Sequence, residues 1–172
     1  MKTIVIYSSK TGFTRRYAGW IAKEAGAECL PLAEAKKKDL AGYDAIVFGG
    51  WACVGSIKDI GWFTENMERW KGKKRIVFCV GASPVTSDVE KSLAQNFNEP
   101  KLEEVNVFYC PGGLNYENMS VRTRLMMRMF VKAIKAKKDK SAIEEEMARV
   151  MSASYDISDK KYIEPIIKCL RG

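Results

Sequence analysis

The chain has 172 residues, 47% hydrophobic and 29% charged, which predicts one ordinary globular domain spanning residues 1–172. Its longest uncharged stretch, residues 45–57, is too short to cross a bilayer, and no signal peptide is visible, so we expect a cytoplasmic protein. The absence of histidine excludes Ser-His and Cys-His nucleophile pairs and leaves no imidazole to complete a zinc site. We therefore expect no metal and assign any difficult chemistry to a bound cofactor.

The formal net charge of +8 is concentrated in one segment. Residues 120–140 contain eight basic residues and one acid, a local balance of +7, so the rest of the chain is close to neutral. A basic segment on a neutral body is not the pattern of a uniformly basic nucleic-acid binder, and we expect no nucleic acid as a partner.

Five short runs of β-branched and aliphatic residues predict strands at residues 3–7, 27–32, 43–49, 75–81 and 105–110. Four of them are nearly continuous rather than alternating, as in strands buried on both faces. The weaker run at 27–32 predicts an edge strand, where Pro31 is tolerated. Cys79 and Cys110 lie inside such runs, and we expect them to behave as small buried hydrophobes.

Helical patterns are predicted at residues 14–25, 58–70, 87–97, 119–136, 141–150 and 160–170. Alternation of strands and helices implies parallel strands, right-handed crossovers and helices on both faces of the sheet. The prediction is a three-layer α/β/α sandwich with a five-stranded parallel sheet in the order 2-1-3-4-5. A Rossmann-type order remains compatible with the pattern.

The segment SSKTGFT follows the first predicted strand and opens the first helix, the place where open α/β sheets bind ligands. Backbone N–H groups in a tight turn and the helix dipole favour a phosphate there. Ser9, Thr11 and Thr14 add hydroxyl donors, Lys10 adds charge, and Gly12 lets the backbone approach closely. The alternative is a plain strand–turn–helix junction with Thr14 as the N-cap. Neither GxxxxGK[ST] nor GxGxxG is present, which disfavours the commonest nucleotide motifs.

The run from Ser9 through Phe13 to Thr14 resembles the [ST]-x-T-G-x-T phosphate loop of flavodoxins. That resemblance implies a flavodoxin-like fold and non-covalently bound FMN. In flavodoxins the flavin ring lies between the loops that follow the third and fourth strands. Here those loops correspond to residues 49–56 and 81–87, and the residues in them that the resemblance suggests for cofactor binding are Trp51, Ala52, Cys53, Val54, Gly55, Gly81, Ala82 and Ser83.

We call residues 49–56 the first ring loop and residues 81–87 the second. Two side chains of the first ring loop each have two possible roles. Trp51 either stacks on the flavin or packs on the edge of the sheet, and Cys53 either tunes the flavin or is a passive loop residue. The backbone from Ala52 to Gly55 is the more general candidate, since its N–H groups can bond the pyrimidine side of the ring without a particular side chain.

The run CPGGLNYENMSVRTRLMMRMFVKAIK, which begins at Cys110, resembles flavodoxin-like protoporphyrinogen oxidases that pass electrons to quinone. Three functions therefore stay open. The first is an FMN electron carrier for a redox partner protein, and the second is an enzyme like those oxidases, coupled to quinone at a membrane surface. The third is an FMN-free phosphate-binding or interaction module.

The predicted helix at 119–136 has an apolar stripe and a basic stripe. The apolar stripe comprises Val121, Leu125, Met129 and Ile134, with Met126 and Phe130 beside it, and the basic one Arg124, Arg128, Lys132 and Lys135. In one interpretation the apolar stripe packs on the core and the basic stripe is solvated. In the other, the helix holds the protein at an anionic membrane surface.

Overall fold

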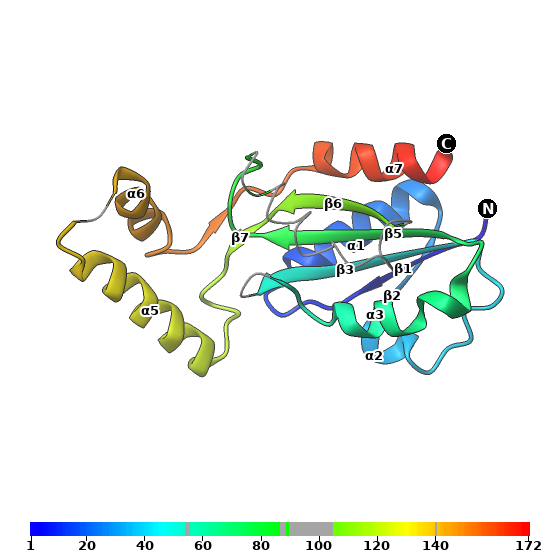
Figure 1. The fold of residues 1–172 in the computed structure, drawn as a ribbon, viewed down its shortest axis with the longest axis horizontal. Coiled ribbons are helices and arrows are strands. Elements are labelled where there is room, and N and C mark those ends of the chain that lie inside the picture. Colours follow the sequence, from blue (N-terminus) through cyan, green and yellow to red (C-terminus); the bar gives the residue numbers. More distant parts are fainter. Residues whose placement is uncertain (54–55, 87–88, 90–104, 140) are drawn as a thin grey trace.

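A parallel sheet forms the centre of the molecule (Figure 1). The computed structural model describes residues 1–53, 56–86, 89, 105–139 and 141–172. The strands of the sheet are β1 (Thr3–Tyr7), β2 (Glu28–Pro31), β3 (Ala45–Cys53), β5 (Lys74–Gly81) and β6 (Asn106–Pro111), in the order β2-β1-β3-β5-β6. The predicted order 2-1-3-4-5 is thereby confirmed, with β2 as the edge strand, and a Rossmann-type order is excluded.

Helices cover both faces of this sheet. One face carries α1 (Phe13–Ala25), the 3-10 turn η3 (Lys160–Ile163) and α7 (Glu164–Arg171); the other carries α2 (Leu32–Ala35), α3 (Ile60–Asn66) and the 3-10 turn η1 (Met67–Trp70). Successive strand residues point to opposite faces, so Ile4 and Ile6 join one core while Val5 joins the other. The predicted three-layer sandwich is confirmed.

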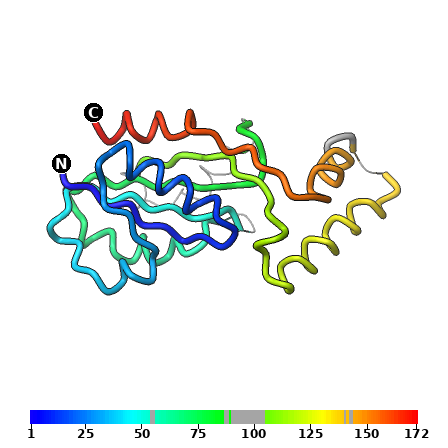
Figure 2. The backbone as a smooth tube through the Cα atoms, turned by 180° about the vertical axis from the view of Figure 1, so that it is seen from behind, coloured from blue at the N-terminus to red at the C-terminus, as the bar shows by residue number. Residues whose placement is uncertain are grey.

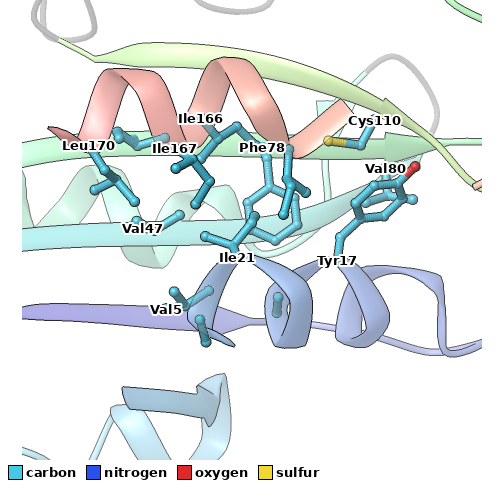
Figure 3. Close-up of a cluster of buried hydrophobic side chains, with 14 of the residues drawn as sticks. Val5, Tyr17, Ile21, Val47, Phe78, Val80, Cys110, Ile166, Ile167 and Leu170 are labelled. Atoms are coloured by element: carbon cyan, nitrogen blue, oxygen red, sulfur yellow. The ribbon is translucent and has the colours of Figure 1, made fainter. Parts of the chain in front are cut away.

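The core on the α1 side also contains one of the two strand cysteines (Figure 3). Tyr17 and Ile21 of α1 pack there with Phe78 of β5 and Ile166 of α7. Cys110 belongs to the same cluster, and Cys79 belongs to the cluster on the other face. Both cysteines are buried hydrophobes, as predicted.

Two predicted boundaries are wrong for local reasons. The third predicted strand, residues 43–49, starts later and continues to Cys53, because its end pairs with β5 and then folds back on β4 (Ser56–Ile57). The helix predicted at 58–70 begins only at Ile60, since Asp59 has a φ of 61° in the left-handed region, and it tightens into η1. The helix predicted at 87–97 lies outside the described residues.

Two further helices, α5 (Val121–Ala136) and α6 (Ala142–Val150), extend from the carboxyl edge of the sheet (Figure 1). Ser120 caps α5 by accepting a hydrogen bond from the Thr123 N–H, and Ser141 with Glu144 forms a capping box on α6. Figure 2 shows this helix pair at one end of the molecule and both chain termini at the other. The chain then returns through β8 (Tyr155–Asp156), which pairs with β7 (Gly113–Leu114). Among the described residues, no helix is long and apolar enough to span a bilayer.

Candidate functional site

The loop between β1 and α1 lies at the carboxyl edge of the sheet (Figure 1). Gly12 is the N-cap of α1, with a φ of 104°, and no side chain caps the helix. Thr14 is the second helical residue and is buried, so the alternative that made Thr14 the N-cap is wrong. A 13-residue helix thus opens at this loop without a side-chain acceptor for its first N–H groups, which leaves them available to an anion.

Ser9 supplies the sharpest indication of an anion in this loop. Its hydroxyl oxygen is buried and has no hydrogen-bond partner among the residues that the structure describes. A buried hydroxyl without a partner costs about 1–3 kcal/mol, and an oxygen of a phosphate would accept its hydrogen bond. The neighbouring Ser8 differs, because its hydroxyl donates to the Asp59 carboxylate over 2.5 Å. The donor set at Ser9 therefore fits a phosphate group.

The remaining predicted loop residues take different positions. The Phe13 side chain is buried in the core, so only its backbone can serve a ligand. Lys10 is exposed, and its ammonium group donates to the Thr123 hydroxyl over 2.6 Å. The Thr11 carbonyl accepts a long hydrogen bond, 3.5 Å, from the Asn115 side chain. Sequence reasoning missed Asn115 and Thr123, since nothing local to either residue indicates contact with a loop more than 100 positions away.

The first ring loop is shorter than predicted, because its first residues belong to β3. Trp51 is half-buried and lies in register with Val80 of β5, while Ala52 pairs with Ile57 of β4. Ala52 and Cys53 are exposed at the end of the strand. Two further predicted residues, Val54 and Gly55, lie outside the described part of the chain. The described residues form a strand end rather than a free loop.

The second ring loop begins at Gly81, the last residue of β5, and two tyrosines hold it. Tyr109 donates to the Ser83 carbonyl over 2.8 Å, and Tyr155 donates to the Ala82 carbonyl over 2.6 Å. A Cβ on Gly81 would lie 2.3 Å from the Tyr109 hydroxyl oxygen, so only glycine fits beneath that ring.

Burial raises the pKa of Tyr109 and of Tyr155, so both hydroxyls stay protonated donors to a more alkaline pH than an ordinary tyrosine would. Neither tyrosine was predicted as part of the site. The only sequence signal for Tyr109 was its place in the strand run, which indicates burial but no partner.

The three loops meet at one edge because parallel strands end on the same side of the sheet. β1, β3 and β5 are adjacent, and the Ser8 N–H donates to the Gly49 carbonyl over 2.8 Å, which ties the first loop to β3. The geometry offers a phosphate cradle beside two backbone segments that can border a flat ring.

Residues 4–141 match the model of a family described as the flavodoxin domain. The chain belongs to the flavodoxin family. FMN is the cofactor of this family, and Ser9 with the start of α1 fits its phosphate end on the structural evidence above. Nothing among the curated proteins matches this chain.

Several solved structures are similar to this chain. A flavodoxin, WrbA-like protein from Agrobacterium tumefaciens is 19% identical with a TM-score of 0.50, over 87% of this chain and 96% of that one. A Lactobacillus acidophilus flavoprotein in complex with FMN is 20% identical with a TM-score of 0.45, over 64% and 91%. The Bacillus subtilis Trp repressor binding protein is 16% identical with a TM-score of 0.49, over 81% and 100%. At 19% identity, the likeness to the Agrobacterium tumefaciens protein bears on the fold alone.

Proposed function

We propose that this protein binds one FMN non-covalently at the carboxyl edge of its sheet and transfers electrons through it. The observation that carries the proposal is the buried, unpartnered Ser9 hydroxyl beside the uncapped start of α1. Bound FMN would supply the redox chemistry, since a flavin can accept and release electrons.

The chain's own residues would bind and orient that group. Ser9 and the first N–H groups of α1 hold the phosphate, and Thr11 and Thr14 remain candidate hydroxyl donors. At the ring, Ala52 at the exposed end of β3 and the carbonyl segment at Ala82, held by Tyr155, would supply the borders. The second ring loop needs little rearrangement to bind a ligand, because Tyr109 and Tyr155 already hold its backbone by hydrogen bonds.

The test is a visible absorbance titration of the purified protein with FMN, with riboflavin in parallel. We expect a flavin spectrum shifted from that of free FMN, and tighter binding of FMN than of riboflavin, which lacks the phosphate. A Thr11→Ala/Thr14→Ala variant should loosen FMN by about tenfold or more and leave riboflavin nearly unchanged. Equal affinities for the two flavins would reject the phosphate loop. Absence of any flavin binding would favour the FMN-free phosphate-binding module instead.

A second candidate is an oxidase resembling the quinone-coupled protoporphyrinogen oxidases. It is favoured by the exposed apolar side chains of α5, whose first turn contacts the phosphate loop through Thr123. Such a surface suits an apolar substrate or quinone better than a polar carrier protein. Anaerobic oxidation of protoporphyrinogen by the FMN-loaded protein with a soluble quinone would support this candidate. Flavin reduction only by a protein reductase would favour the electron carrier.

A further inference from the structure

Helix α5 turns its apolar side toward solvent. Five of its large apolar side chains are between 47% and 81% exposed: Val121, Leu125, Met126, Met129 and Phe130. Only Val131 and Ile134 are buried, on the opposite side of the helix, where α5 packs against α6. The interpretation that the apolar stripe packs on the core is therefore wrong, and Ile134 does not belong to that stripe. An exposed apolar patch of this continuity is unusual on a monomeric protein and indicates a binding surface.

The exposed side of α5 is also cationic. The helix contains no acid, and Arg122, Arg128 and Lys132 are exposed along or beside the apolar patch. None of these three forms an ion pair with an acid among the residues described. Arg124 is directed elsewhere, since it donates to the carbonyls of Glu117 and Met119. The surface thus combines apolar side chains with uncompensated positive charge.

We propose that α5 docks in the plane of an anionic phospholipid bilayer. Its apolar patch would enter the boundary between headgroups and acyl chains, and its arginines and lysine would contact the lipid phosphates. A second copy of this chain is the poorer occupant. In a two-fold pairing of the same faces, Arg122, Arg128 and Lys132 would meet their own copies with no acid on either helix. An anionic bilayer offers acyl chains to the apolar patch and phosphate groups to the three basic side chains.

Docking at α5 would also affect the cofactor site. This effect rests on the proposed function, whereas the docking itself does not. The first turn of α5 contacts the phosphate loop through the hydrogen bond from Lys10 to Thr123. A docked helix would therefore hold the carboxyl edge of the sheet near the lipid surface. Redox partners dissolved in the membrane would then reach that edge without leaving the bilayer.

The experiment is vesicle flotation with the full chain, in the presence and absence of FMN. Vesicles of phosphatidylcholine alone are compared with vesicles of equal parts phosphatidylcholine and phosphatidylglycerol. Each basic residue near an anionic surface contributes roughly fivefold to partitioning, so Arg122→Gln/Arg128→Gln/Lys132→Gln should weaken binding about 100-fold. Leu125→Ser/Met129→Ser should also release the protein, with unchanged circular dichroism because both side chains are exposed.

A matched control removes the same charge elsewhere. Lys36 and Lys37 directly follow α2, Lys71 directly follows η1, and all three are exposed. Figure 1 shows α2 far from α5. Replacement of these three lysines by Gln should leave flotation unchanged. Equal loss in this control, or equal flotation with neutral vesicles, would overturn the proposal. A dimer in light scattering that dissociates in Leu125→Ser/Met129→Ser, with no flotation of the wild type, would assign the surface to a second copy. Flotation that is independent of FMN supports docking even if the proposed cofactor fails.

Discussion

The Lys10 ammonium group donates a hydrogen bond to the Thr123 hydroxyl, with 2.6 Å between Nζ and Oγ1. These residues are 113 positions apart, and the bond joins the loop after the first strand to the first turn of α5. Ser120 also holds this turn. Its hydroxyl oxygen lies 2.9 Å from the Thr123 hydroxyl oxygen and accepts a hydrogen bond from the Thr123 N–H, which caps the helix. A ligand at the phosphate loop and a partner at α5 would therefore act on directly connected segments.

The buried hydroxyl of Ser9 gives opposite expectations for stability and for binding. Ser9→Ala should leave the unliganded protein as stable as the wild type or more stable by up to about 1 kcal/mol, since it removes an unsatisfied polar group. It should weaken FMN binding about tenfold by removing a hydrogen bond to a charged group. Calorimetric titration and urea unfolding measure the two effects. Riboflavin is the control, and its affinity should not change.

Substituting Gly12 and Gly19 by alanine separates the effect of backbone conformation on stability from that of steric contact. A Cβ would meet nothing within 4 Å at either position, but only Gly12 has a positive φ, 104°. Gly12→Ala should therefore lower the free energy of unfolding by about 1 kcal/mol. Gly19→Ala, inside α1, should raise it by about 0.5–1 kcal/mol. Urea unfolding without ligand measures both, and a shift of the same sign in the two variants would contradict the explanation.

The Tyr17 hydroxyl connects three segments of the chain inside the α1 core. It donates to the Pro111 carbonyl over 2.6 Å and accepts from the Asp159 N–H over 3.1 Å. Tyr17→Phe should destabilise the fold by about 1–3 kcal/mol, because both backbone groups lose their partner. Tyr116→Phe is the comparison, since that hydroxyl makes a single bond, to the Met151 carbonyl at a half-buried site. A larger loss at Tyr116 than at Tyr17 in urea unfolding would refute this ranking.

Because the thiol of Cys79 is buried, we predict that the free energy of unfolding falls at alkaline pH. Burial raises its pKa to about 12, from about 9 for an ordinary thiol. Between pH 9 and 12 the unfolded chain releases this proton and the folded chain keeps it. The free energy of unfolding should therefore fall as pH rises through this window, by up to about 1.4 kcal/mol per unit.

Cys79→Val removes this contribution, whereas Cys53→Ser changes an exposed thiol and serves as the control. Tyrosines titrate in all three proteins, so the difference between the wild type and Cys79→Val isolates the buried thiol. We measure the free energy of unfolding in urea at each pH for the wild type and for Cys79→Val. Plotted against pH, the two free energies should run parallel below pH 9 and diverge above it. Parallel pH dependence up to pH 12 would show that Cys79 does not titrate as inferred.

Much of the fold could be predicted from local patterns. Continuous β-branched runs indicated buried parallel strands, and the Ser9–Thr14 motif predicted that the first helix begins at this loop and that the loop binds phosphate. The strands and the start of the helix are confirmed, because strand burial and turn conformation depend on neighbouring residues, whereas phosphate binding stays a prediction. The family match agrees with the motif.

Contacts between distant segments could not be predicted in this way. The hydrogen bonds from Tyr109 and Tyr155 to the loop after β5, and from Lys10 to Thr123, join residues that no local pattern relates. Helix α5 is the clearest case. Periodicity showed that it has an apolar side, but a helix lowers its free energy by burying that side only where another element covers it. In the tertiary structure α6 packs against α5, Val131 and Ile134 are buried, and the side around Met129 is exposed. Local patterns in the sequence indicate which residues are apolar and roughly where strands and helices lie, because both depend on neighbouring residues. Which of the apolar residues meet water depends on how the elements pack, and the sequence pattern does not contain that information.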